Sequence, residues 1–549
     1  MTRWKPKDLV GIVIGPIERI ADALERKLGL FSVVIISLSA MIGSGLFVLP
    51  ALAMLEMGGG TNPVAGIWIA YLIAALVVLP GAISKSELST AMPTSGGSYV
   101  YIQKTFGPLI GTISGLGLWA NFMLKSAFAL IGFKAYLWVI EEILNISIDE
   151  KIAALVLLVF IVIINILGVK RIKKIQTPIV LISTSYLFLL CVWALFTIDL
   201  DWSLVLSKNS FGSGWDSIAS TAAFVFVSYA GVTKIAAVGG EIKNPTKNIP
   251  KGILLSLLIS SLLYIFVTLI MGAAMDPSSY MDEGNGVARG DPVYIFALEV
   301  GGKNIGIIAA ILAVVTMTSM ALAGIMASSR FLFAMSRDNL LPEFLEDVHS
   351  KFETPHWAII CTGLAMGAAI TFLPVKDVAK LASGFKIMIF IVINLCVIIL
   401  RTSSKSHSWY NPEWKSPLFP LFQVAGIITS IGLLILMGSK AFIGASAAII
   451  LGLLIYKTYG EKHINLEITP WETFKLMLRN PDEAEKRRIY AAFHAADSER
   501  NNHLNLHEFI AAIEALELKC EGGHDALRVY FHSADLNEDG VIDIDEFLS

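Results

Sequence analysis

Oxygen-bearing side chains recur at fixed intervals near the C-terminus, in the pattern that holds a calcium ion. Calcium takes about six to eight oxygen ligands, and a twelve-residue loop supplies them from positions 1, 3, 5, 7, 9 and 12 around a turn glycine. Residues 535–546 match every position, with Gly540 at the turn. The predicted ligands are Asp535, Asn537, Asp539, the carbonyl of Val541, Asp543 and Glu546.

Residues 497–508 form another loop with the same spacing, which starts 38 positions upstream. Asn502 replaces the turn glycine, and asparagine tolerates the left-handed backbone that the turn requires. The predicted ligands are Asp497, Glu499, Asn501, His503, Asn505 and Glu508. Fewer carboxylates predict weaker calcium binding than at 535–546, and a purely structural loop remains the alternative. Together the loops predict a paired EF-hand domain.

A different chemistry is indicated by Gly43, Ser44 and Gly45, in the middle of the first long apolar run. Backbone that leaves the helix inside a membrane is tolerated only where it lines a cavity or is buried in protein. A break here would free amide donors at the positive end of the next half-helix, which suit a carboxylate. The carbonyls that end the preceding half suit an ammonium group or a cation. Tight packing of small residues between helices is the alternative.

Residues 226–234 offer a second candidate break, in the sixth apolar run. Interruptions in corresponding spans of two repeats are the best sequence indication of a transport site near the bilayer midplane. Their separation by five spans is expected when two five-helix repeats are inverted in the membrane. The two segments together therefore predict a site for a small zwitterion.

The elements that must position these segments are transmembrane helices. Hydrophobic residues make up 55% of the chain and charged residues 16%, against about 25% charged in soluble domains. Such a chain needs lipid as the solvent for its surface. No basic cluster predicts nucleic-acid binding, and four scattered cysteines predict no disulfide framework. No catalytic constellation or channel filter stands out, so we expect neither an enzyme nor a channel.

Twelve apolar runs approach the roughly 20 residues that a transmembrane helix needs. They lie at about 29–55, 63–84, 107–140, 152–168, 177–198, 215–239, 252–275, 304–335, 356–375, 381–400, 417–438 and 441–457. With the N-terminus inside, the inner loops carry 14 Lys and Arg, and the outer connections carry about seven. These inner loops are 85–106, 169–176, 241–251, 336–355 and 401–416. This positive-inside bias predicts that both termini are cytoplasmic.

Several motifs resemble those of the amino acid–polyamine–organocation (APC) superfamily of transporters. Residues 42–50 are similar to its first-helix signature, and further similarities follow in the superfamily's order. These lie at 87–93, 96–101, 106–108, 241–250 and 329–342. The resemblance covers about residues 28–457. It implies an all-α membrane protein with twelve transmembrane helices in a leucine-transporter-like 5+5 inverted repeat, in which helices 1 and 6 are broken.

The resemblance also implies how a substrate is held. An amino acid carboxylate would meet the amides of Gly43, Ser44 and Gly45, together with the Ser44 hydroxyl. The α-amine would meet the carbonyls of Met41, Val227 and Ala230. Tyr229 is either an aromatic gate or an ordinary buried aromatic residue.

The ion that drives transport stays open between sodium and protons. Relatives that couple to protons or lack sodium often carry a lysine in span five, where this chain has Ser183. The resemblance implies a sodium site made by the Thr318 and Ser319 hydroxyls with the carbonyls of Ser39, Ile42 and Val315. Lys125 lies at bilayer depth, where a charge is a functional candidate by default. It is a proton carrier, a substitute for a bound cation, or a structural charge.

We therefore predict a plasma-membrane carrier that moves an amino acid, or a related amine, by alternating access. The predicted parts are an amphipathic N-terminal segment on the inner leaflet (1–28), a transporter domain (29–457), a linker (458–484) and the EF-hand domain (485–549). Only three residues follow Glu546. We expect so short an end to make the EF-hand pair dock on the transporter's cytoplasmic face, where calcium would regulate transport. A substrate-sensing receptor with calcium-linked signalling is the alternative.

Overall fold

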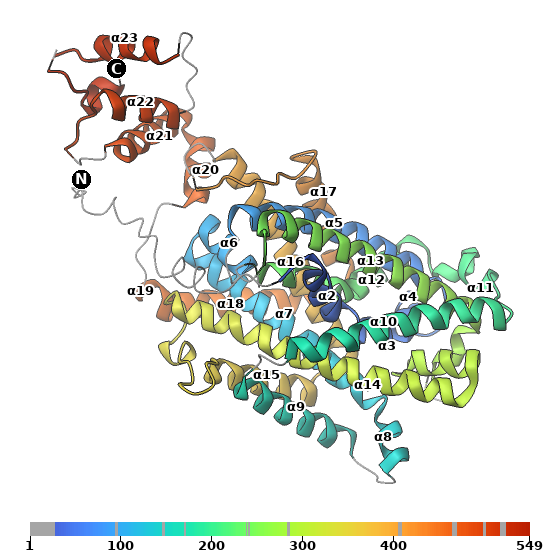
Figure 1. The fold of residues 1–549 in the computed structure, drawn as a ribbon. Helices are drawn as coiled ribbons and strands as arrows, with labels where there is room; N and C mark the ends of the chain where they lie inside the picture. Colours follow the sequence, from blue (N-terminus) through green and yellow to red (C-terminus); the bar gives the residue numbers. More distant parts are fainter. Residues whose placement is uncertain are drawn as a thin grey trace. The chain divides into compact units, whose positions relative to one another are not determined.

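Helices form nearly all of the regular secondary structure in the computed structural model of the chain (Figure 1). The structure describes residues 28–93, 97–144, 149–168, 172–237, 239, 242–282, 286–403, 409–463, 469–497, 501–516, 523–537 and 539–548. The predicted N-terminal amphipathic helix lies outside this set, apart from Leu28. Among these residues, β-pairing occurs as isolated bridges that join Leu28 to Ile242, Met281 to Ala288, and Leu504 to Ile542.

The chain divides into two compact units. The first comprises residues 1–103, 108–395 and 412–464, and the second comprises 104–107, 396–411 and 465–549. Helices α6 and α16 begin in the first unit and end in the second. The second unit therefore contains short pieces of the apolar part of the chain as well as the polar C-terminal region.

The helices before the C-terminal region follow one another with short connections. They are α2 (Leu30–Met41), α3 (Ser44–Phe47), α4 (Leu49–Met57), α5 (Ile67–Ala91), α6 (Ser98–Phe106), α7 (Pro108–Lys134), α8 (Leu137–Leu144), α9 (Glu150–Leu167), α10 (Ile172–Thr197), α11 (Ser203–Leu206), η2 (Lys208–Phe211), α12 (Trp215–Val225), η3 (Phe226–Ala237), α13 (Pro245–Ala274), η5 (Pro277–Tyr280), α14 (Pro292–Arg337), η6 (Glu343–Leu345), α15 (His356–Phe372), α16 (Val375–Thr402), α17 (Leu421–Leu436), α18 (Ser439–Ile455), η8 (Tyr456–Gly460) and α19 (Glu461–His463).

Nine of the described helical segments are long and apolar enough to cross a bilayer. Shorter apolar helices occupy the first, ninth and eleventh predicted runs, at Leu30–Met41, His356–Phe372 and Leu421–Leu436. Each of the twelve predicted apolar runs thus contains an apolar helix. The predicted inner connection over 85–106 is largely helical, because α5 continues to Ala91 and α6 begins at Ser98. Polar residues of α5 in this stretch, such as Ser86 and Glu87, are buried, whereas Lys104 on α6 is exposed.

The degree of burial separates central helices from peripheral ones. The most apolar window of α7 is 94% buried and that of the α12–η3 segment is 88% buried, whereas the corresponding windows of α9 and α18 are each 22% buried. On α9 the exposed residues include Val156, Val159 and Phe160. Apolar surface of this extent needs lipid contact. The segments α2 and η3 pack against each other and against α13, so both candidate breaks lie in the protein interior.

The C-terminal region begins with an amphipathic helix and continues as two helix–loop–helix motifs. Its helices are α20 (Pro470–Arg479), α21 (Pro481–Ala496), α22 (Leu506–Ala515), α23 (Gly523–Ala534) and α24 (Ile544–Leu548). Phe493, Phe509 and Phe531 form a common core. The short α24 closes it, since the ring of Phe547 lies 5.6 Å from that of Phe493 and 5.8 Å from that of Phe509. The paired loops therefore have a core of their own despite the short final helix.

Candidate functional site

The first apolar run is interrupted where the sequence predicts. Helix α2 ends at Met41, and α3 starts at Ser44. Between them, Ile42 is extended (φ −77°, ψ 110°) and so is Gly43 (φ 173°). Among the described residues, the amides of Gly43, Ser44 and Gly45 find no hydrogen-bond acceptor. These are the three donors predicted for a carboxylate, and all three residues are buried.

The second segment departs from the helix in a different way. Instead of a gap, the chain tightens after Val225 into a 12-residue 3-10 helix, η3. Such helices seldom exceed about 3–4 residues, and a stretch inside a longer helix often marks a functional hinge. Ser383 of α16 bridges the transition, since its hydroxyl accepts a hydrogen bond from the Val227 amide and donates one to the Phe224 carbonyl, each 3.0 Å long.

Glycines allow the two segments to touch. A Cβ atom on Gly231 would lie 2.6 Å from the carbonyl carbon of Ala40 and 2.7 Å from Cγ of Met41. A Cβ atom on Gly45 would lie 2.9 Å from Oγ of Ser228. The sequence therefore needs glycine at both places because the two segments lie against each other. The predicted residues Met41, Val227 and Ala230 are buried on these segments.

Tyrosine hydroxyls donate hydrogen bonds to backbone carbonyls at the two interrupted segments. The Tyr264 hydroxyl donates to the Met41 carbonyl at 2.7 Å and to the Ser228 carbonyl at 3.3 Å, while that of Tyr71 donates to the Gly45 carbonyl at 2.9 Å. Tyr229, the predicted gate, donates to the Tyr71 carbonyl at 3.0 Å, and its ring lies 5.1 Å from that of Tyr264. Sequence reasoning missed Tyr71 and Tyr264. The available signal was a phenol inside an apolar span, which needs a hydrogen-bond partner when buried.

Buried lysines surround the second segment. Nζ of Lys125 donates to the Ser228 carbonyl at 3.4 Å, and its charge is close enough to interact with those of Lys234 and Lys386. All three side chains are at most 5% exposed. Sequence reasoning did not single out Lys386, whose ammonium lies 4.6 Å from the centre of the Phe390 ring. The region beside Ser228 thus gathers three buried lysines.

The residues predicted for sodium are placed in several environments. Ser39 donates to the Ile36 carbonyl, and Thr318 donates to the Val314 carbonyl, each at 2.8 Å within its own helix. Val315 is 38% exposed. The Ser319 carbonyl accepts from the Gln176 side chain at 3.2 Å.

A buried hydroxyl pair joins α10 to α14, the helix that carries Val315, Thr318 and Ser319. Oγ of Ser183 and Oγ1 of Thr316 are 2.7 Å apart, and both side chains are buried. Ser183 is the position for which the resemblance implies a lysine in relatives that couple to protons or lack sodium. The partner that the structure gives it is therefore a neutral hydroxyl on α14.

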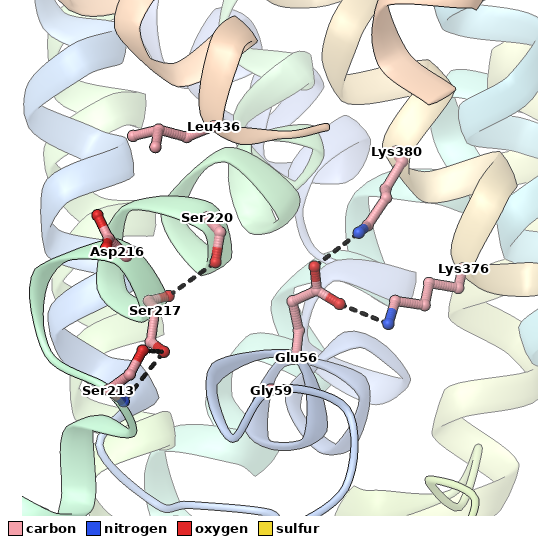
Figure 2. A pocket seen from close by; sticks show the side chains of 9 residues that line it. All are labelled: Glu56, Gly59, Ser213, Asp216, Ser217, Ser220, Lys376, Lys380 and Leu436. Carbon is pink, nitrogen blue, oxygen red and sulfur yellow. Dashed lines mark hydrogen bonds and ion pairs between the residues drawn. The ribbon is translucent and has the colours of Figure 1, made fainter. Parts of the chain in front are cut away.

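An open pocket of about 410 Å³ lies where α4, α12, α16 and α17 have their ends (Figure 2). Glu56 forks between two lysines there, with one carboxylate oxygen 2.6 Å from Nζ of Lys376 and the other 2.6 Å from Nζ of Lys380. Burial alone would raise the pKa of Glu56, but the hydrogen bonds and charges of the two lysines outweigh it and lower the pKa below its ordinary value. The opposite wall carries Asp216 and three serines: Ser213, Ser217 and Ser220.

The two predicted calcium loops share one hydrogen-bond pattern. In the later loop, Asp535 accepts from the amides of Asp539 and Gly540 at 3.1 and 2.9 Å. In the earlier loop, Asp497 accepts from the amides of Asn501 and Asn502 at 3.1 and 2.8 Å. The left-handed turn is present in both, at Gly540 (φ 83°) and, as predicted, at Asn502 (φ 61°). The loops pair through Leu504 and Ile542, whose amides donate to each other's carbonyls at 2.8 and 2.9 Å.

The oxygen ligands of both loops fit a hard cation, and in this structure their carboxylates accept hydrogen bonds from backbone amides of the loops. Glu546 accepts from the Leu536 amide at 3.1 Å and from the Asp543 amide at 3.0 Å, and Glu508 accepts from the Asn505 amide at 3.1 Å. Glu499 lies outside the described residues. Among those described, no three acidic, His or Cys side chains converge as metal ligands. Oxygen donors at every ligand position match calcium better than a softer metal.

Helix α20 contacts two other segments of the second unit. Thr469 caps it in a capping box with Glu472, and Pro470 occupies the first turn. The ring of Trp471 lies 5.6 Å from that of Phe106, at the end of α6, and stacks on Phe474 at 5.9 Å. Helix α20 also packs on α21, which it precedes directly. It therefore joins the first EF-hand helix to a segment that leads into α7.

Comparison with known proteins bears on both parts of the chain. Residues 28–456 match the family model described as amino acid permease, and residues 486–549 match the model described as an EF-hand domain pair. Both predicted resemblances are thereby confirmed. Together with the apolar helices, these matches identify an integral membrane protein.

Several characterised relatives cover most of the chain. Branched-chain amino acid permease BcaP of Bacillus subtilis (strain 168) is 28% identical over 461 residues, which are 81% of this chain and 95% of the relative. The methylthioribose transporter of the same organism is 26% identical over 458 residues, with the same coverage. Its serine/threonine exchanger SteT is 26% identical over 421 residues, or 75% of this chain and 91% of the relative. These names share transport and differ in substrate.

Proposed function

Since the chain belongs to the family of amino acid permeases, we propose that it is a secondary active transporter that carries amino acids by alternating access. Its twelve apolar helices would span the plasma membrane as a 5+5 inverted repeat, with both termini in the cytoplasm. The basic inner loops support this orientation. The transporter domain would extend over residues 29–457, followed by a linker and the EF-hand domain.

The observation that carries the proposal is the interrupted first helix. Three buried amides, at Gly43, Ser44 and Gly45, lack acceptors among the described residues, and a substrate carboxylate would complete them. The carbonyls of Met41, Val227 and Ala230 would receive the ammonium group. A carbonyl has two lone pairs, so Met41 can accept from Tyr264 and still accept from a substrate.

Backbone groups of this kind recognise the common part of an amino acid and leave its side chain undefined. The named substrates of the relatives range from branched-chain amino acids to serine and threonine. We take branched-chain amino acids as the first substrates to test, because the relative with that name shares 28% identity over nearly its full length.

Coupling is proposed to involve Lys125 or a sodium ion. Lys125 contacts the Ser228 carbonyl of η3, so loss or gain of its proton would act directly on the second segment. The proposed sodium ligands remain Ser39, Ile42, Val315, Thr318 and Ser319. Uptake driven by an imposed proton gradient in the absence of sodium would favour Lys125.

Calcium is proposed to regulate transport through the EF-hand pair docked on the cytoplasmic face. The ligands would be Asp497, Glu499, Asn501, His503, Asn505 and Glu508 in one loop, and Asp535, Asn537, Asp539, Val541, Asp543 and Glu546 in the other. A bound ion would draw Glu508 and Glu546 away from loop amides and reorient α21. Because α21 packs on α20, the change would reach Trp471 and Phe106.

The deciding experiment is uptake into liposomes that contain the purified full-length protein. Each labelled proteinogenic amino acid is offered with an imposed sodium gradient, a proton gradient or neither. We expect at least one amino acid to accumulate above the level in protein-free liposomes. Binding without net uptake of any amino acid would contradict the transporter proposal and favour a sensor.

Replacing Tyr264 by phenylalanine is expected to lower amino acid uptake about fivefold. The change removes the hydroxyl that orients the Met41 carbonyl, an interaction of about 1 kcal/mol. Tyr280→Phe is the matched control, since its buried hydroxyl donates to the Met271 carbonyl at 2.8 Å, away from both segments. Initial uptake rates and thermal unfolding are measured for both variants. If Tyr264→Phe and Tyr280→Phe lose uptake equally, the Tyr264 hydroxyl has no specific role at the Met41 carbonyl.

Replacing Trp471 by alanine is expected to remove most of the calcium-dependent change in uptake while calcium binding persists. The variant loses the ring contact with Phe106 but leaves both calcium loops intact. Leu478→Ala is the control, because Leu478 lies on the same helix with its side chain 72% exposed. Uptake is compared in calcium and in chelator. A calcium response that survives in the tryptophan variant would exclude this route.

A further inference from the structure

The pocket formed by Glu56, Asp216, Lys376 and Lys380 has a charge pattern that the interrupted helices do not use. Two lysines of α16 lie on one wall, and Asp216 with three serine hydroxyls lies on the wall made by α12 (Figure 2). Two carboxylates and two ammonium groups make the lining formally neutral but strongly polarised. Its volume of about 410 Å³ falls within the range of about 300–1,000 Å³ found for small-molecule sites.

The pocket is connected to the two interrupted segments by the half-helices that line it. Glu56 lies near the end of α4, which follows the first interruption through α3. Asp216 lies at the start of α12, which leads into η3. The connections between helices at this end are the outer ones in the proposed topology. The pocket therefore lies at the outer end of the half-helices that lead to Gly43 and Ser228 in the proposed topology.

The charged groups on the two walls of the pocket differ in their ion-pair partners. Glu56 holds both lysines, but the two contacts differ in exposure: the Lys376 side chain is 41% exposed, whereas those of Lys380 and Glu56 are 17% and 11% exposed. The exposed Lys376 can therefore turn to another carboxylate at small cost while Lys380 keeps Glu56 in place. The Asp216 carboxylate is exposed and has no ion-pair partner in the described part of the chain. Beside it, Oγ of Ser217 is fixed by the Ser213 hydroxyl at 2.7 Å and the Ser213 amide at 3.1 Å.

We propose that this pocket is a second binding site for a zwitterionic amino acid, with Lys376 receiving its carboxylate and Asp216 its ammonium group. Leu436 supplies an apolar surface for the substrate side chain. The inference rests on the proposed function, because it supposes an amino acid substrate. It adds an outer site that a substrate occupies before the inner one, in which release of Lys376 from Glu56 accompanies binding.

The test uses accessibility of a cysteine placed in the pocket, in the full-length protein in liposomes. Leu436→Cys is alkylated with a membrane-impermeant maleimide, with and without saturating L-isoleucine. Leu206→Cys is the matched control, since Leu206 is exposed on α11 and does not line the pocket. We expect isoleucine to slow alkylation of Cys at 436 about fivefold and to leave the control unchanged. Adding Asp216→Asn should weaken the protecting affinity about tenfold.

Two further variants separate pocket binding from closure of the transporter around the inner site. Gly231→Ala and Gly45→Ala each disturb the inner segments. Protection that persists in a folded inner-site variant without uptake supports the pocket. Protection that disappears in the inner-site variants but survives Asp216→Asn would overturn the proposed pocket site, because closure of the transporter alone would explain the effect. Uptake without protection would also overturn the proposed pocket site but leave the transporter proposal standing. Protection without uptake in the protein with only Leu436→Cys would contradict the transporter proposal and leave the pocket site standing.

Discussion

Gly231→Ala is expected to reduce amino acid uptake about thirtyfold while the protein remains folded. The added methyl group would lie 2.6 Å from a backbone carbon of Ala40 and 2.7 Å from Cγ of Met41. Real carbon atoms do not approach so closely, and backbone cannot rotate away as a side chain can. Overpacking of this kind costs about 2 kcal/mol, which corresponds to about thirtyfold in an equilibrium. The cost falls on the contact between α2 and η3.

The measurement is the initial rate of uptake in liposomes, with thermal unfolding recorded on the same preparation. Gly432→Ala is the matched control, because a Cβ atom there would have no neighbour within 4 Å. In the control we expect unchanged uptake and equal or slightly higher stability, since alanine favours a helix over glycine. If Gly231→Ala transports normally, the two segments need not approach each other, and the inner site as proposed is incorrect.

The first interruption could be predicted from sequence because its signal is local. Gly43 and Gly45 flank Ser44 within an apolar run, so the chain marks the break even though distant residues bond the carbonyls around it. The same holds for Asn502 and Gly540, since turn geometry follows from the residue at the turn. The 3-10 form of η3 was not predicted, because Ser383 on a distant helix satisfies the groups that change partner.

Residues that complete the site from other helices escaped the sequence reasoning for the same reason. Tyr71 and Tyr264 carry no motif, and only the fold brings their hydroxyls to the Gly45 and Met41 carbonyls. The pocket around Glu56 draws on four helices, so its charge pattern is invisible along the chain. The helical structure within 85–106 was not predicted, because polar residues such as Glu87 mark a loop only when they are exposed.

Glu546→Gln is expected to remove calcium regulation while uptake in chelator stays unchanged. Position 12 of an EF-hand loop supplies both oxygens of a carboxylate, and affinity depends on the charge of the ligand set. Glutamine keeps the size of the side chain and one acceptor for the amides of Leu536 and Asp543. It loses the charge and one of the two ligand oxygens. We expect calcium affinity of this loop to fall about a hundredfold.

Asp545→Asn provides the matched control, because it removes one negative charge from the residue just before Glu546. Asp545 is exposed and holds no ligand position. Calorimetric titration of the full-length protein with calcium reports affinity, and uptake in calcium and in chelator reports regulation. The control should keep both, since screening makes a lone exposed charge worth little. Glu508→Gln should have the smaller effect on regulation, because its loop carries fewer carboxylates. Regulation that survives Glu546→Gln but is lost in Glu508→Gln would contradict this prediction and make the earlier loop the sensor. The calcium occupancy of that loop, rather than of the later one, would then control uptake.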